Sequence, residues 1–344
     1  MKHNKDRRGS SFVSLTVVLV FLFSVCQGAL LLAGDREKYE EKFEKTVSLP
    51  ATGEVSLENI SGDIKVTTWN KEEVKISATK VSQADTMERA KENADLVQIK
   101  VNKVGNRVVI TTEYPKNMGL RGRSINVSVD YNLTIPDRAS MRANSVSGDV
   151  DARRIGGEAE LKTVSGDVVA QGIGGEAELS SVSGDVTARD AEKGLDCHSV
   201  SGDVKITSVK GGAKIKSVSG DVSLTGCQGD VEAESVSGDV ELRDIAGARS
   251  VKAKSVSGDI DYIGTIESGG RYNMEGHSGD ITFSVPENSS FELEVETFSG
   301  EIDTDFAISI IGKQEKGHLS GKVGEGGAWV ELSTFSGDIT IKSR

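Results

Sequence analysis

Short runs of alternating apolar and polar residues repeat every eighteen residues between Val146 and Ser255. Each repeat contains the tripeptide Ser-Gly-Asp, which begins at Ser147, Ser165, Ser183, Ser201, Ser219 and Ser237. In the first unit, six places hold apolar or small residues, namely Val146, Val150, Ala152, Ile155, Ala159 and Leu161. The last three lie nine residues after the first three. Each unit therefore predicts two corners, each followed by a short strand whose alternate side chains point inward.

Units of this kind are stable only in a stack. A strand of three to five residues has no stability alone, but strands about 4.8 Å apart pair every backbone group with the coils above and below. We therefore predict an all-β fold, a parallel β-solenoid with about 18 residues per coil. Parallel crossovers make it right-handed. Two inward columns fill its interior: Val150, Val168, Val186, Val204, Val222 and Val240, and Leu161, Leu179, Cys197, Ile215, Ala233 and Ala253.

Two other solenoid types disagree with the pattern. A left-handed hexapeptide helix also has eighteen residues per coil, but a six-residue step from Val146 through Ala152 reaches Glu158. A calcium-binding β-roll uses nine-residue halves with the pattern G-G-x-G-x-D-x-U-x, which the chain lacks. The coil is therefore expected to fold without a metal ion.

Residues 49–143 predict one coil followed by a cap that covers the open end of the stack. The nine-residue half occurs at Gly53–Leu57 and Gly62–Val66, after which the register lapses. A cap is expected because an uncovered stack exposes strand edges. The expected elements are a strand at Val74–Ala78, a helix at Gln83–Val97 capped by Ser82, a hairpin of Gln98–Val104 and Arg107–Thr112, a loop at Lys116–Arg123 and a strand at Asn126–Ile135.

Residues 144–344 predict the solenoid repeat domain. After Ser257 the spacing of the Ser-Gly-Asp motifs stretches, and the extra residues are expected in corner loops. Five phenylalanines are expected to join the core of wider terminal coils: Phe283, Phe291, Phe298, Phe306 and Phe335.

Residues 1–34 predict a signal peptide or an uncleaved N-terminal membrane anchor. Four basic residues precede an uncharged run at Ser11–Gly34 that is long enough to cross a bilayer. Cleavage and anchoring both remain open, and either carries the rest of the chain out of the cytoplasm. The charged residues 35–48 are expected to act as a tether.

Composition excludes several classes of function. The net charge is −12, and no cluster of basic residues with interleaved aromatics follows the first ten residues, which argues against a nucleic-acid partner. The four histidines show no metal-ligand spacing, and neither a phosphate-binding loop nor a nucleophile elbow is present. Cys197 and Cys227 fall in different inward columns and are interpreted as core residues. No catalytic residue, cofactor or metal site is assigned.

One aspartate per coil predicts a ladder at the Ser-Gly-Asp corner. Neighbouring carboxylates about 4.8 Å apart repel by roughly 0.9 kcal/mol in water, whereas a charge-assisted bond to a corner N–H contributes about 1.5–3 kcal/mol. A structural role is favoured over a cation site, provided that each carboxylate has such a partner. The ladder consists of Asp149, Asp167, Asp185, Asp203, Asp221, Asp239 and Asp259.

Outward acidic residues of the early coils form a candidate ligand face. Alternation places Glu160, Glu178 and Asp196 in one column, followed by Lys214, Glu232 and Lys252. Stacked like charges are unfavourable, and a cationic ligand such as a basic peptide would relieve them, although a merely solvated face also fits. The candidate residues are Glu158, Glu160, Glu176, Glu178 and Asp196.

The repeats of Ser-Val-Ser-Gly-Asp-Val, the approach Tyr131–Pro136 and the endings after Phe298 and Phe335 resemble the bacterial putative-adhesin domain family of unknown function, over residues 49–341. The resemblance implies a β-solenoid exported to the cell envelope, periplasmic, membrane-anchored or on the cell surface. It implies adhesin-like binding of a protein, peptide or glycan. Two alternatives stay open: a partner protein in envelope-stress signalling, and a polysaccharide-active β-helix enzyme. The enzyme is disfavoured because carboxylate pairs that recur in a repeat mark no unique site.

Overall fold

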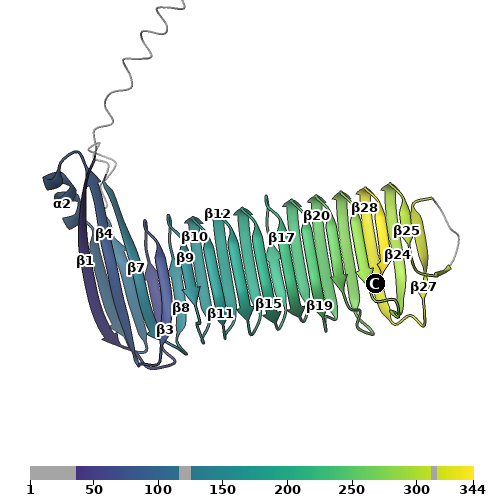
Figure 1. Ribbon diagram of the computed structural model, residues 1–344, viewed down its shortest axis with the longest axis horizontal. Coiled ribbons are helices and arrows are strands. Elements are labelled where there is room, and N and C mark those ends of the chain that lie inside the picture. The colour runs from purple at the N-terminus through teal and green to yellow at the C-terminus, as the bar shows by residue number, and fades with distance from the viewer. Residues whose placement is uncertain (1–35, 116–124, 311–315) are drawn as a thin grey trace, which may run out of the picture.

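The computed structural model describes residues 36–115, 125–310 and 316–344. These residues form a long stack of β-coils with a cap at its N-terminal end (Figure 1). Two sheets run along the stack, a 14-stranded sheet that we call sheet A and a 15-stranded sheet that we call sheet B. Within the stack the strands of each sheet pair in parallel from coil to coil, so the predicted all-β solenoid is confirmed. Its handedness stays a prediction.

Sheet A takes one strand from each coil. Its strands in the stack are β3 (Ile64–Trp69), β9 (Val150–Arg153), β11 (Val168–Ile173), β13 (Val186–Ala191), β15 (Val204–Lys210), β17 (Val222–Gln228), β19 (Val240–Ala246), β21 (Ile260–Gly264), β23 (Ile281–Val285), β29 (Ile339–Ser343) and β25 (Ile302–Thr304).

Sheet B takes the other strand of each coil. Its strands in the stack are β2 (Glu54–Glu58), β8 (Ser140–Asn144), β10 (Ala159–Ser165), β12 (Ala177–Ser183), β14 (Leu195–Ser201), β16 (Ala213–Lys216), β18 (Val231–Ser237), β20 (Ser250–Ser257), β22 (Arg271–Ser278), β28 (Ala328–Ser336) and β24 (Phe291–Ser299).

Both predicted inward columns lie in the core. Each valine from Val150 to Val240 pairs with its counterpart one coil away and is fully buried. The column from Leu161 to Ala253 is likewise fully buried. Because every coil buries the same side chains against its two neighbours, the stack is one continuous core.

Val146 and its copies, the first of the six apolar or small places in each unit, face solvent and not the core. Alternation instead places Ser145, Thr163, Ser181 and their copies inward, where the hydroxyls of Thr163 and Ser181 donate to the carbonyl oxygens of Gly148 and Gly166. The next residue must then face solvent, and the seven valines of this column are 36–50% exposed. We call the exposed column the valine stripe: Ile60, Val146, Val164, Val182, Val200, Val218, Val236, Val256, His277, Phe335 and Phe298.

The same exposure corrects the prediction for two phenylalanines. Phe283 and Phe291 are fully buried and Phe306 packs against the core, as expected. Phe298 and Phe335 instead lie in the valine stripe, where their rings stack 4.9 Å apart. His277 stacks on Phe335 at 5.1 Å.

Coils do not stack in chain order at the C-terminal end. The last coil of the sequence, β28 and β29, lies between the coil of β22 and β23 and the coil of β24 and β25. Two antiparallel strands, β26 (Ser309–Ile310) and β27 (His318–Val323), continue sheet B beyond β24. They cover the edge of the sheet, which is the function of a cap.

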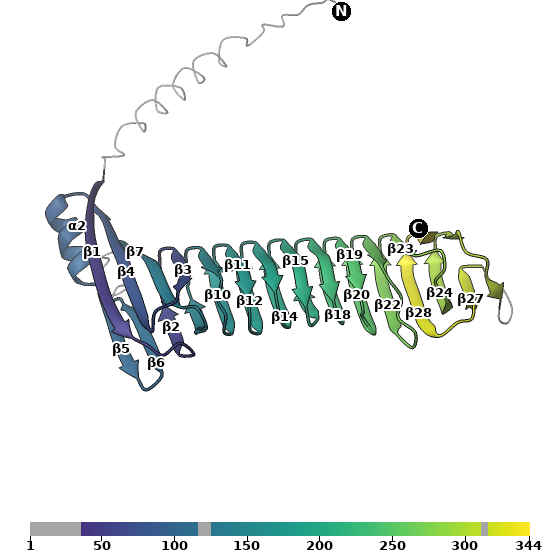
Figure 2. The same cartoon turned by 60° about the horizontal axis from the view of Figure 1, so that its bottom comes forward.

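The N-terminal cap extends both sheets. In sheet A, β7 (Asn126–Pro136) pairs with β3, and the antiparallel strands β4 (Glu73–Ala84) and β1 (Glu37–Ser48) follow. In sheet B, the predicted hairpin forms from β5 (Gln98–Val104) and β6 (Arg107–Glu113), and β6 pairs with β2. Both extensions project past the edges of the stack (Figure 2).

Four expectations for the N-terminal region need correction or lie outside the described residues. The tether at residues 35–48 is instead β1, which pairs with the whole length of β4. The helix is α2 (Met87–Asp95) and is capped by Thr86, because Ser82 is buried within β4. Residues 1–34 and the loop at 116–123 lie outside the described residues.

Candidate binding groove

The aspartate ladder runs unbroken along the corner between sheets B and A. Oδ1 of each aspartate from Asp63 to Asp338 accepts the backbone N–H of the acidic residue in the next coil, at 2.8–3.1 Å. All seven aspartates named from the sequence belong to it, and each therefore has a charge-assisted bond that offsets the repulsion between neighbours. Within the described ranges, no group of three or more His, Cys, Asp or Glu side chains is arranged to hold a metal ion.

A groove of about 1140 Å³ lies on the outer face of sheet B. It runs from Glu54 and Arg107 beside the cap to Ser250 and Lys252. Its floor includes Gly194 and Gly212, which occupy the places held by Glu158 and Glu176 in earlier coils. The column thus carries no side chain in the two coils between Glu176 and Asp230, and at Gly194 no atom lies closer than 4.0 Å to the place of a Cβ, so the groove is hollow there. All five candidate residues named from the sequence line this groove: Glu158, Glu160, Glu176, Glu178 and Asp196.

Three of these five acids have basic partners within the fold. Lys162 Nζ lies 2.9 Å from Glu160 Oε1 and 2.6 Å from Glu178 Oε1, and Arg142 Nε lies 2.8 Å from Glu160 Oε2. Asp196 Oδ1 lies 3.0 Å from His198 Nδ1. The two carboxylates hydrogen-bond to the Lys162 ammonium and raise its pKa, Glu178 having the larger effect. The repulsion between Glu160 and Glu178 is therefore relieved by Arg142 of the same column and by Lys162 of the next outward column.

Glu158 and Glu176 differ from the other three acids. Both are exposed, they are neighbours in adjacent coils, and neither has an ion pair among the described residues. Asp230 lies further along the same column, where its Oδ1 accepts the backbone N–H groups of Arg249 and Ser250. Glu158 and Glu176, which have no ion pair among the described residues, therefore lie on one side of the hollow.

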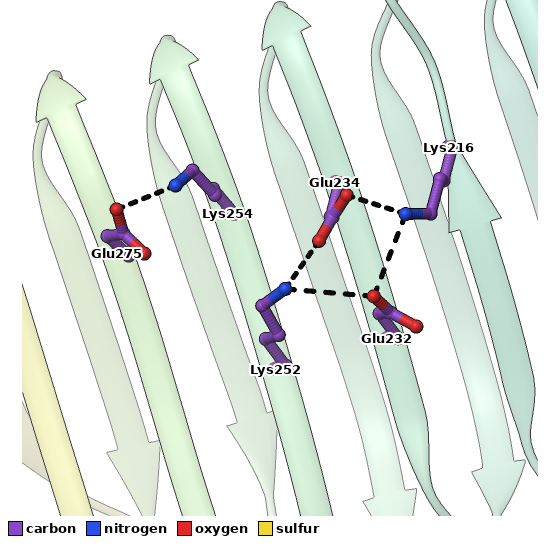
Figure 3. A network of polar contacts seen from close by, with 6 residues as sticks. All are labelled: Lys216, Glu232, Glu234, Lys252, Lys254 and Glu275. Carbon is purple, nitrogen blue, oxygen red and sulfur yellow. Dashed lines mark hydrogen bonds and ion pairs between the residues drawn. The ribbon is translucent and has the colours of Figure 1, made fainter.

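Beyond the acidic part, the same face carries an ion-pair network (Figure 3). Glu234 lies between Lys216 and Lys252, with Nζ to carboxylate distances of 2.9 and 2.6 Å. Glu232 lies 3.7 and 3.6 Å from the same two ammonium groups. Hydrogen bonds from Lys252 and then Lys216 lower the pKa of Glu234 to about 2. The C-terminal end of the groove is therefore electrically balanced.

Replacing Glu234 with glutamine should make the fold less stable at neutral pH, by about 1 kcal/mol. The folded-state pKa lies below the ordinary value of 4.5, so the ionised group favours folding. Its contribution is present above about pH 4.5 and disappears as the pH falls towards 2. Urea unfolding of wild type and Glu234→Gln across this range should show the two curves converging. Glu275→Gln is the control, because among the described residues Glu275 has a single ammonium partner, Lys254 at 2.7 Å, and the loss of this one ion pair should cost less.

The two cysteines among the described residues are core residues and form no reactive site. Cys197 and Cys227 are both free and fully buried. Burial raises the pKa of the Cys197 thiol and raises that of Cys227 to about 11. In the same residues, no helix has the length and hydropathy needed to cross a membrane.

The sequence matches the family model described as Toastrack DUF4097 over residues 52–263 and 246–342. No curated protein matches it. Similar solved structures include a putative adhesin from Parabacteroides distasonis ATCC 8503, with 12% identity, 90% of this chain and 98% of that chain covered, and a TM-score of 0.39. A putative adhesin from Bacteroides fragilis NCTC 9343 is also similar, with 14% identity, 88% of this chain and 97% of that chain covered, and a TM-score of 0.31. A putative lipid binding protein from Parabacteroides distasonis ATCC 8503 has 14% identity, the same two coverages and a TM-score of 0.36. These TM-scores are too low to support a functional argument.

Proposed function

The chain belongs to the Toastrack DUF4097 family, and we propose that it is a non-enzymatic interaction protein, exported to the cell envelope or surface, whose groove on sheet B binds a basic peptide segment of another protein. Export rests on the basic start and apolar run of residues 1–34. A non-enzymatic role rests on the repetitive origin of the acids in the groove, which sets no pair apart as acid and base.

The observation that carries the proposal is the pair of open carboxylates at Glu158 and Glu176. In their column they come directly before the two coils in which Gly194 and Gly212 form the floor of a hollow, so an incoming Lys or Arg side chain finds open space beside exposed carboxylates. Glu160, Glu178 and Asp196 border the same space but already have basic partners. A cationic ligand therefore gains most from the first two acids.

Binding of a lysine-rich peptide to the full chain tests this assignment. The double variant Glu158→Gln and Glu176→Gln should weaken binding about tenfold or more at low salt, because two partly desolvated charge pairs are lost. Glu160→Gln with Glu178→Gln should weaken it less, since these acids already share Lys162. Affinity is measured by fluorescence anisotropy at several salt concentrations, and it should fall as salt rises.

A matched control lies on the same face. Glu292 belongs to the same outward column as Glu158 and Glu176 but lies three coils beyond the last strand of the groove, and Glu296 faces outward four residues further along the same strand. Glu292→Gln with Glu296→Gln changes the net charge equally and should leave the affinity unchanged. Equal weakening by both pairs would show a non-specific charge effect. No weakening by Glu158→Gln with Glu176→Gln would remove the groove as the binding site.

A further inference from the structure

The valine stripe is an apolar surface that the proposed groove does not use. It follows the Ser-Gly-Asp corner over the whole stack, and its seven valines are 36–50% exposed. The column contains no Asp, Glu, Lys or Arg, although the net charge of the chain is −12. Single exposed apolar residues are normal on proteins, but an uninterrupted line of them indicates an interaction surface.

The stripe is large enough for an interface. Eleven coils at a rise of about 4.8 Å give a length of roughly 50 Å. With the exposed serine column beside it and the outward side chains on each flank, the strip is about 15 Å wide, or roughly 700 Å² per molecule. Specific protein interfaces bury about 800 Å² per partner. The stripe is therefore close to the area that a dimer needs.

The period of the stripe favours one occupant. Its side chains recur every coil, so a partner packs closely along the whole length only if its own side chains have the same spacing. A second copy of this chain has that spacing by construction. From this match we infer that the valine stripes of two copies pack against each other and form a homodimer.

The cap sets the orientation of the two copies. Tyr131 of β7 pairs with Ile64, the first residue of β3, so residues Asn126–Asp130 and the paired parts of β4 and β1 continue past the corner where the stripe lies. Figure 1 shows this projection beyond the edge of the stack. In a parallel dimer the two projections collide and hold the stripes apart. In an antiparallel dimer whose two-fold axis passes near Val218, Ile60 lies opposite Phe298, so each projection lies past the end of the other copy's stripe.

Lysine substitutions in the stripe test the dimer. Sedimentation velocity of the full chain should show a dimer in wild type, and Val182→Lys with Val200→Lys should raise its Kd on the order of 100-fold, because each ammonium is buried without a partner. Val169→Lys with Thr187→Lys is the matched control, since both residues face outward on sheet A. The control should dimerise as wild type does. Circular dichroism melting of all three proteins checks that each is folded.

Cross-linking with a short bismaleimide, in a Cys26→Ser background, tests the orientation. Val218→Cys should cross-link to itself, whereas Val146→Cys should cross-link to Phe335→Cys and not to itself. Self-cross-linking of Val146→Cys would overturn the antiparallel arrangement. A monomeric wild type would overturn the dimer, and stripe-dependent sedimentation of that monomer with phosphatidylcholine vesicles would assign the stripe to lipid instead. Dimerisation should persist at high salt, unlike binding of a basic peptide to the groove.

Discussion

Val204→Asp should abolish stable folding of the stack. Val204 is fully buried in the middle of its column, paired with Val186 in one neighbouring coil and Val222 in the other. A carboxylate at this place has no polar partner, and burying it unpaired costs on the order of 4–5 kcal/mol or more. In a stack each coil is stabilised only by its two neighbours, so the damage separates the two halves of the solenoid. Urea unfolding followed by circular dichroism should show loss of the cooperative transition or a large drop in its midpoint.

The neighbouring residue supplies the control for this change. Lys205 is exposed on the outer face of the same strand, so Lys205→Asp adds the same carboxylate outside the core. Its unfolding free energy should stay within about 0.5 kcal/mol of wild type. Wild-type stability of Val204→Asp would mean that this column is not the core of the protein.

The repeat predicted the solenoid because periodicity carries both local and long-range information. A strand at Val150 alone says nothing about its partner, but a copy eighteen residues later places Val168 beside it. Register, sheet order and the two buried columns all follow from that spacing. The aspartate ladder follows as well, since the same spacing brings each carboxylate to the N–H of the next coil.

At the Ser-Gly-Asp corner, the alternation of apolar and polar residues does not determine which side chains point inward. Val164 is apolar, yet its neighbour Thr163 takes the inward place and donates its hydroxyl to the carbonyl oxygen of Gly148. The need to pair a backbone oxygen at the turn outweighs the burial of one valine side chain. A serine or threonine precedes each of these valines, and this is the signal in the sequence for the direction of the valine side chains.

Segments without a repeat were predicted less well. β1 is rich in charged residues because it is an edge strand, and its composition therefore resembled a tether. The position of β28 and β29 between earlier coils depends on pairing with distant strands, which local pattern does not encode. The motifs at Ser299 and Ser336 have nearly the same sequence, and that sequence does not tell which neighbouring coil each one contacts.

Prediction of the candidate groove was partial for a related reason. The outward column of Glu160, Glu178 and Asp196 follows from the repeat, as does its change of sign at Lys214. Lys162 contacts both Glu160 on its own strand and Glu178 in the next coil, and the contact with Glu178 depends on how far the lysine side chain extends across the strands. The hollow depends on glycines at two places in the neighbouring column. Only with these details do Glu158 and Glu176 stand out from the other acids.

Gly184→Ala should be nearly as damaging as a charge in the core, although Gly184 lies at the corner. Its φ of +155° is poorly tolerated by alanine, and an added Cβ would press on the backbone carbonyl of Gly166 and lie 2.9 Å from Asp167 Oδ1. That carbonyl also accepts the hydroxyl of Ser181, and the Asp167 carboxylate accepts the N–H of Asp185. Relief of the clash therefore separates two coils and weakens both bonds. Overpacking and backbone strain together should cost about 3–5 kcal/mol.

Gly247→Ala separates the two contributions to this cost. Gly247 also has a positive φ, +65°, but no atom lies within 4 Å of the place where its Cβ would be. Its substitution should therefore cost only about 1 kcal/mol, the ordinary penalty for a left-handed backbone. Urea unfolding of both variants measures the difference, which reports the close approach of coils at the Ser-Gly-Asp corner. Equal losses in the two variants would show that the backbone conformation alone, and not the spacing between coils, requires glycine there.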